Sequence, residues 1–263
     1  MIPAGLVDGS FGPRGFRVCV EKVADFVAAT GDDAARWIES APPGFMASAM
    51  FVVASDLLRE LAGHSVIHGE QTFTWHRPFL VESVLEVSGA VTRLRERGDV
   101  SFVDFEVTVS DGGKTVAEGT SLFLVSGRFA AGSTADERAE PAANDDGTPG
   151  PGQVSASRAD LIRYAAATRD WNPIHWDHQA AVAAGLPGVV AHGLLQAAWA
   201  FAAASTLRTG DRPLDTARVR FRNPLLPATP AMVSVDEEDG MAVVAIGDDG
   251  VEYLSARIQL TER

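Results

Sequence analysis

The feature that most constrains the fold of this chain is an internal repeat, because the two ends of the sequence carry the same succession of patterns. Three short anchors recur in the same order and in similar contexts. With offsets of 138, 144 and 146 residues, they pair Thr30–Asp32 with Thr168–Asp170, Pro43-Gly44 with Pro187-Gly188, and Pro78 with Pro224. The offset drifts slowly and in one direction, which is typical of a duplicated domain.

A segment of unusual composition separates the two copies. Residues 130–153, AAGSTADERAEPAANDDGTPGPGQ, are rich in Ala, Gly, Pro and acidic residues and offer almost nothing to bury. Such composition is typical of a linker. The sequence therefore predicts an N-terminal unit over 1–129, a linker over 130–153 and a C-terminal unit over 154–263.

Each copy has the same expected order of elements. A short amphipathic helix (22–29 and 158–167) precedes a long helix that is apolar on nearly all sides (45–62 and 191–206), so the long helix should be enclosed. Alternating strands follow, with hairpin turns expected at residues 98–99, 111–113, 239–240 and 249–250. A buried helix wrapped by a curved antiparallel sheet is the hotdog arrangement. We therefore predict an α+β double hotdog.

Composition limits the function classes. The formal net charge of −13 argues against general binding of nucleic acid, which needs a basic surface. Cys19 is the only cysteine, so no internal disulfide can form, which fits a reducing compartment. The first residues lack the pattern of a signal peptide, and the most apolar stretches are interrupted by polar residues. A cytoplasmic protein that does not cross a membrane is expected.

The densest group of chemically useful residues is RDWNPIHWDHQAA, residues 169–181. Pro173 stiffens this loop, so Asp170 and His175 can be aimed at one point, where a carboxylate and an imidazole can share a water and move its protons. His192 and Gly193 follow at the expected start of the long helix, whose free N–H groups favour developing negative charge. On local spacing alone, an ordinary turn fits the loop equally well, and an ordinary helix start with a core histidine fits His192 and Gly193 better.

Together, the two segments resemble the hydratase-2 motif of MaoC-like dehydratases and (R)-specific enoyl-CoA hydratases. That motif reads D-x-N-P-[aliphatic]-H-x-D, followed after an interval by H-G-[aliphatic]. It is filled here in order by Asp170, Asn172, Pro173, Ile174, His175 and Asp177, and then by His192, Gly193 and Leu194. Arg169 departs from the family, which usually has Gly at this position.

The resemblance implies a hydro-lyase that interconverts trans-2-enoyl and (R)-3-hydroxyacyl thioesters carried by coenzyme A or an acyl carrier protein. Asp170 would be the base on water, and His175 would deliver or share the proton that reaches C2. Gly193 N–H would polarise the thioester carbonyl, while Asn172 and His192 would position the loop or the water. The resemblance implies no metal and no redox cofactor.

The repeat also predicts that only the C-terminal unit is catalytic. Asp32 aligns with Asp170, but Trp37 takes the place of His175 and Ala49 that of Gly193. Asp32 is most simply a helix-ending turn, and Trp37 is expected to fill the vestigial pocket or to close the far end of an acyl tunnel. The two units should pair within one chain as a pseudo-dimer, and a further homodimer is compatible with this arrangement.

Other residues leave alternatives open. Arg218, Arg220 and Arg222 alternate along an expected strand, so they are either a solvated face or contacts for the phosphates of coenzyme A or phosphopantetheine. His64, His68 and His76 are interpreted as solvated loop histidines rather than metal ligands. Two alternative functions are a dehydratase for carrier-bound polyketide or other secondary-metabolite intermediates, and a non-catalytic subunit that binds acyl thioesters.

Overall fold

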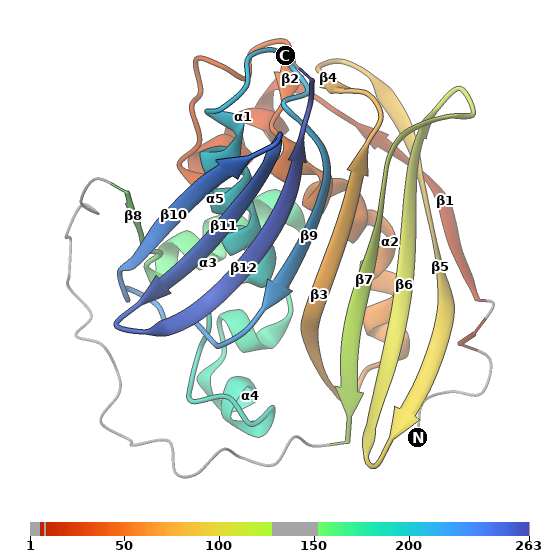
Figure 1. The fold of residues 1–263 in the computed structure, drawn as a ribbon. Coiled ribbons are helices and arrows are strands. Elements are labelled where there is room, and N and C mark those ends of the chain that lie inside the picture. The colour runs from red at the N-terminus through yellow and green to blue at the C-terminus, as the bar shows by residue number, and fades with distance from the viewer. Residues whose placement is uncertain (1–5, 8, 128–151, 263) are drawn as a thin grey trace.

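The structure, a computed structural model, describes residues 6–7, 9–127 and 152–262. Its main feature is one antiparallel sheet of ten strands that curves around the helices on one side (Figure 1). The strand order is β1-β5-β6-β7-β3-β9-β12-β11-β10-β8. No parallel pairing occurs among these strands, so the predicted antiparallel α+β architecture is confirmed.

The N-terminal unit supplies one half of this sheet. Its strands are β1 (Ser10–Arg17), β3 (Ser65–Trp75), β5 (Val84–Arg97), β6 (Val100–Asp111) and β7 (Lys114–Ser126). Its helices are α1 (Val20–Thr30) and α2 (Met46–Glu60), with a 3-10 turn at Pro43–Phe45. A separate two-residue ladder joins β2 (Ser40–Ala41) to β4 (Phe79–Leu80).

The C-terminal unit supplies the other half. Its strands are β8 (Gln153–Val154), β9 (Leu214–Phe221), β10 (Ala231–Glu238), β11 (Met241–Asp248) and β12 (Val251–Leu260). Its helices are α3 (Arg158–Thr168), α4 (His178–Ala183) and α5 (Gly193–Ser205), with a 3-10 turn at Pro173–His175. The expected short and long helices of both repeats are therefore present, within a few residues of their expected ends.

The hairpin turns lie where the sequence places them. Asp239 and Gly240 join β10 to β11, and Asp249 and Gly250 join β11 to β12, with positive φ at all four residues. This conformation matches the right-handed twist of the flanking strands, and Asp-Gly pairs adopt it readily. Short-range sequence chemistry therefore fixes these hairpins.

The long helices form the centre of the core. In α2, nine residues are buried, and in α5 ten are buried, so neither helix presents a wide solvated face. The short helices α1 and α3 pack against each other, with the rings of Phe26 and Tyr164 6.1 Å apart. These two residues occupy equivalent places in the repeat, 138 positions apart, so the helix pair marks the pseudo-twofold relation between the units.

The two units join through equivalent strands, β3 and β9. Their antiparallel pairing runs from Glu70 opposite Arg220 to Thr74 opposite Thr216. Each unit thereby covers an edge of the other, and unpaired edges invite aggregation. The predicted pseudo-dimer within one chain is confirmed.

Most of the expected linker lies outside the described residues. Of its residues, only Gly152 and Gln153 are described, and Gln153 already pairs with Met232 as part of β8. The predicted boundary at residue 154 therefore cuts through a short strand. Among the helices that the structure describes, none has the length and apolar character that crossing a membrane requires.

Candidate active site

The loop after α3 is shaped by short-range hydrogen bonds. The Thr168 hydroxyl donates to the Tyr164 carbonyl, at 2.8 Å, and accepts from the Asp170 N–H, at 3.3 Å. Arg169 between them has a φ of 67°, a left-handed conformation that reverses the chain direction. The Asn172 side chain then caps the 3-10 turn by accepting from the Ile174 N–H. The Asn172 side chain therefore contacts the backbone of this loop, and its role at the site stays a prediction.

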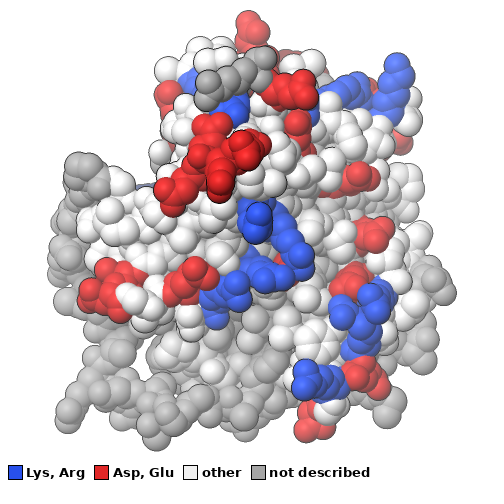
Figure 2. Space-filling view, in the orientation of Figure 1, with Lys and Arg blue, Asp and Glu red and all other residues white. Residues whose placement is uncertain are grey.

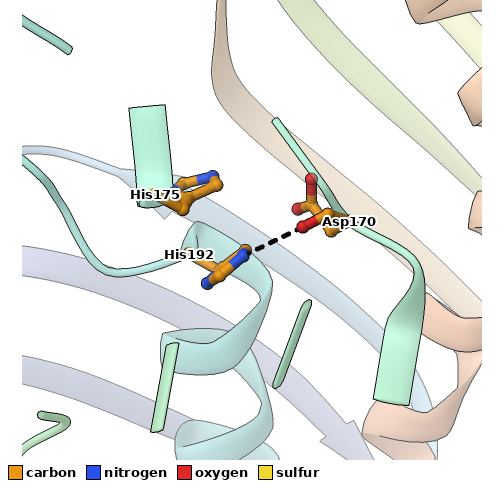
Figure 3. A group of neighbouring side chains, drawn as sticks. All are labelled: Asp170, His175 and His192. Carbon is orange, nitrogen blue, oxygen red and sulfur yellow. Dashed lines mark hydrogen bonds between the residues drawn. The ribbon is translucent and has the colours of Figure 1, made fainter. Parts of the chain in front are cut away.

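The loop brings Asp170 and His175 together with His192 at the start of α5 (Figure 3). A carboxylate oxygen of Asp170 and one ring nitrogen from each histidine all lie within 4.8 Å of one another. All three residues are buried, with 7%, 7% and 0% of their surface exposed, respectively. At these separations, one water molecule can hydrogen-bond to both Asp170 and His175.

Backbone carbonyls determine the tautomers of the two imidazoles. His175 Nδ1 lies 2.9 Å from the carbonyl of Val190, and His192 Nε2 lies 3.2 Å from the carbonyl of Asp170. A carbonyl oxygen only accepts, so each of these nitrogens carries the proton. Burial lowers the pKa of His175 to about 4, so its ring is neutral at pH 7 and its Nε2 is an acceptor. His192 stacks on His175 with ring centroids 3.8 Å apart and fixes its plane.

Of the three side chains, Asp170 has a carboxyl group that changes its protonation state near pH 7. Burial raises the pKa of Asp170 to about 7, against the smaller opposing effect of the hydrogen bond from the Asn172 N–H. Both protonation states of this carboxyl group are therefore populated near neutral pH. A carboxyl group poised in this way is suited to general acid–base chemistry.

The N-terminus of α5 faces the same cavity. Its N-cap, His192, makes no side-chain capping bond, and the Gly193 N–H has no hydrogen-bond partner within the described part of the chain. A Cβ at Gly193 would lie 3.0 Å from the ring of Phe221, so close packing is a reason for glycine there. The free N–H and the helix dipole make this end of the helix favourable for negative charge.

Both units build the walls of the cavity, whose volume is about 260 Å³. The C-terminal unit supplies the loop that carries Asp170 and His175, together with the start of α5. The N-terminal unit supplies mostly apolar side chains from α2, β3 and β7, namely Phe51, Leu58, Val66, Ile67, His68 and Phe123. The N-terminal unit is therefore part of the site even though it lacks the motif.

Comparisons with known proteins agree with this geometry. The family described as MaoC like domain matches residues 142–253. Over 184 residues, 68% of this chain, the sequence is 35% identical to 3-hydroxyacyl-thioester dehydratase X from Mycobacterium tuberculosis. The chain contains a MaoC-like domain. The aligned region spans 62% of the length of that relative.

Solved structures extend the likeness to the whole chain. The crystal structure of HtdX from Mycobacterium tuberculosis superposes with a TM-score of 0.79 at 25% identity, covering 96% of this chain and 100% of that one. A conserved hypothetical protein from the same organism, described as having a double hotdog fold, gives a TM-score of 0.64 at 13% identity, covering 97% and 96%. The predicted double hotdog is confirmed.

Sequence reasoning missed three polar residues at this candidate site. Tyr164, on α3, is fully buried beside His192, and burial together with the charge of Asp170 raises its pKa well above the usual value. Gln196 and His68 line the cavity. The interpretation of His68 as a solvated loop histidine is wrong, because it lies on β3 and burial lowers its pKa to about 4.

The three arginines expected on one strand divide into two groups, with Arg218 and Arg220 on β9 and Arg222 directly after it. Arg218 and Arg220 lie on the outer face of the sheet and both donate to Glu70, so their charges are already partly neutralised. Arg222 lines the cavity and contacts Glu252 and Ser255. Figure 2 shows Lys and Arg gathered on this face over β9 and β12. Of the three, only Arg222 therefore reaches the cavity as a phosphate contact would.

Asp170, His175 and His192 also have the composition of a metal-binding group. Their geometry does not suit one, because the two imidazole rings are stacked with an angle of 25° between their planes. The lone pair of an imidazole nitrogen lies in the ring plane, so nearly parallel rings cannot both aim at one ion. The predicted lack of a metal stays a prediction, and this geometry is what supports it.

Proposed function

We propose that this protein is a hydro-lyase that interconverts trans-2-enoyl and (R)-3-hydroxyacyl thioesters. The observation that carries the proposal is the convergence of Asp170, His175 and the N-terminus of α5 on one cavity. The name of the curated relative, a 3-hydroxyacyl-thioester dehydratase, supports the same reaction class. Coenzyme A or an acyl carrier protein as the thiol carrier, and a cytoplasmic location, belong to this proposal.

In the hydration direction, the ionised Asp170 carboxylate takes a proton from water while the oxygen of that water bonds to C3 of the substrate. The electron pair of the C2=C3 bond moves toward the thioester carbonyl, which becomes enolate-like. The Gly193 N–H and the dipole of α5 stabilise the negative charge on that oxygen. Asp170 then returns its proton to C2 on the same face, so addition is syn and the carboxylate is regenerated.

His175 has an orienting role in this scheme. Its Nδ1 proton is engaged by the Val190 carbonyl, so the neutral ring offers only the Nε2 lone pair to the cavity. It can therefore accept the second hydrogen of the water and point the oxygen at C3. The sequence suggests that His175 delivers or shares the proton that reaches C2. In this scheme His175 only orients the water, and Asp170 alone transfers the proton.

Incubation of the protein with crotonyl-CoA tests the proposal. The absorbance of the conjugated thioester should fall as water adds, and chromatography on a chiral phase should identify the (R)-3-hydroxyacyl product. Binding of crotonyl-CoA without any loss of absorbance, at any pH from 6 to 9, would instead favour a non-catalytic binding subunit. Detection of free coenzyme A as the product would indicate a thioesterase.

A further inference from the structure

The cavity contains two polar groups that the proposed reaction does not use. Gln196, on α5 one turn after Gly193, is only 3% exposed, and its Oε1 has no hydrogen-bond partner among the described residues. The Nε2 atom of His68, which is on β3, is also buried and has no hydrogen-bond partner within the same part of the chain. A buried polar group without a partner destabilises the fold, so two such groups in one apolar cavity call for an explanation.

The inward position of His68 depends on an irregularity in β3. Gln71, Phe73 and Trp75 point to the core, so strict alternation would place His68 on the outer face with Glu70. A bulge between His68 and Glu70 shifts the register by one residue, and His68 pairs with Phe123, whose side chain is buried. Bulges re-aim side chains in this way, often beside active sites.

Packing keeps the bulge and the imidazole in place. A Cβ at Gly69 would lie 2.5 Å from a methyl carbon of Leu124, so a larger residue at the bulge would displace the Leu124 side chain. The His68 ring lies between Phe123 and Phe221, with centroid distances of 4.9 and 4.8 Å. Phe221 also packs against Gly193, so His68 is fixed relative to the start of α5.

The charge state of these groups defines what they can bind. Burial keeps the imidazole of His68 neutral at pH 7, with one donor and one acceptor nitrogen, and the Gln196 amide likewise offers both. A neutral oxygen substituent satisfies such groups, whereas a carboxylate would add an uncompensated charge to a desolvated site. At the position of Gln196, the other copy of the repeat has Val52, 144 residues earlier, so this polarity is specific to the candidate active site.

We propose that His68 and Gln196 select acyl thioesters that carry an additional hydroxyl group along the acyl chain. This inference rests on the proposed function, because it assigns the substrate class of the same cavity. The hydroxyl group would exchange hydrogen bonds with His68 Nε2 and the Gln196 amide. Phe51, Leu58 and Phe123 would enclose the hydrocarbon around it.

Matched substrates test this proposal. The probes are trans-2-octenoyl-CoA and its analogues with one hydroxyl group at carbon 5, 6, 7 or 8, positions remote from the reacting carbons. At one of these positions, kcat/KM should exceed that of the plain chain by about tenfold, the value of one or two neutral hydrogen bonds. Equal kcat/KM for all five probes would overturn the proposal.

Variants assign the effect to the two residues. His68→Phe and Gln196→Leu should each remove most of the preference, measured as the ratio of kcat/KM for the hydroxylated chain to that for the plain chain. Leu58→Met, an apolar change in the same wall, should keep the preference. A preference that survives in both polar variants, with native circular dichroism, would contradict the assignment.

A binding measurement separates this inference from the reaction. Calorimetry with octanoyl-CoA and its hydroxylated analogues needs no turnover, and the preferred analogue should bind about tenfold more tightly. If no enoyl thioester is hydrated but this preference is found, the proposed reaction fails and the selectivity stands. If hydration occurs but the analogues bind equally, the proposed selectivity fails alone.

Discussion

The regions around Asp170 and Asp32 begin alike and end differently. In each, a threonine hydroxyl at the end of the short helix donates to the carbonyl four residues earlier, from Thr168 to Tyr164 and from Thr30 to Phe26. The next residue is left-handed in both, with φ of 67° at Arg169 and 69° at Gly31. The aspartate that follows is therefore placed by the same local turn.

Beyond the aspartate, the two regions differ. Asp32 is half-buried, and its carboxylate accepts the N–H of Asp33 at 2.7 Å, as a turn-forming residue does. Trp199 of α5 donates its Nε1 proton to the Thr30 carbonyl and occupies space beside this turn. Trp37 is buried under the Arg36 guanidinium and does not line the cavity at Asp170. Whether Trp37 fills the vestigial pocket or closes the far end of an acyl tunnel stays a prediction.

This comparison separates what the fold needs from what the proposed chemistry needs. The threonine–aspartate turn is present in both units, so it belongs to the fold. Within the described residues, the proline-stiffened histidine and the glycine at the first position of the long helix accompany Asp170 and not Asp32. If the comparison is valid, changes at equivalent positions should affect activity very unequally.

The largest expected difference is between His175 and its counterpart Trp37. His175→Ala should lower turnover of an enoyl thioester at least about 100-fold, because water loses its orienting acceptor in the cavity. Trp37→Phe should change turnover only a few-fold. Steady-state kinetics on both variants, with circular dichroism as a folding check, measures the contrast. Similar losses in the two variants would argue that the units share the chemistry.

Stability should change in the opposite direction to activity at Asp170. Its folded-state pKa of about 7 lies above the usual 3.8, so ionisation favours the unfolded chain as pH rises from 4 to 7. Asp170→Asn should therefore stabilise the protein by about 1–4 kcal/mol at pH 7, and the gain should shrink toward pH 4. Denaturant unfolding at the two pH values tests this. A gain of the same size at both would contradict the buried carboxylate as its source.

The proposed role of Asp170 as base also predicts the pH profile. For hydration, kcat/KM should rise about tenfold per pH unit below 7 and level off above it, because the ionised carboxylate is required. His175, with a pKa of about 4, stays neutral over this range. Rates measured from pH 5 to 9 would show whether kcat/KM rises in this way below pH 7. Activity that instead falls from pH 6 to 8 would make Asp170 the proton donor.

The smallest expected effect concerns Arg169 and Gly31, which share a left-handed conformation. A non-glycine residue there is strained by about 1 kcal/mol, so Arg169→Gly should raise the free energy of unfolding by about that amount. Gly31→Ala should lower it similarly. Thermal unfolding of the two variants provides the measurement. If Arg169→Gly instead lowers the free energy of unfolding, the contacts of the arginine side chain stabilise the fold by more than the strained backbone destabilises it.

Much of the fold could be predicted because its signals are local. The repeat, the Asp-Gly hairpins and the apolar helices are all encoded in short stretches of sequence. The location of the candidate site could also be predicted from a short stretch of sequence, because Asp170 and His175 share one loop. The places of His68, Gln196 and Tyr164 could not be predicted, because they depend on a bulge and on contacts between distant elements. Alternation alone assigns His68 to the wrong face of β3.

The central claim, that only one of two equivalent aspartates is catalytic, is tested most directly by paired kinetics on Asp170→Asn and Asp32→Asn. Both variants replace a carboxylate by an amide at the same point of the repeat, so each is the control for the other. With one enoyl thioester, Asp170→Asn should lower kcat by at least about 100-fold and Asp32→Asn by only a few-fold. Equal losses in two folded variants would mean two working sites or a shared one, and would contradict the account.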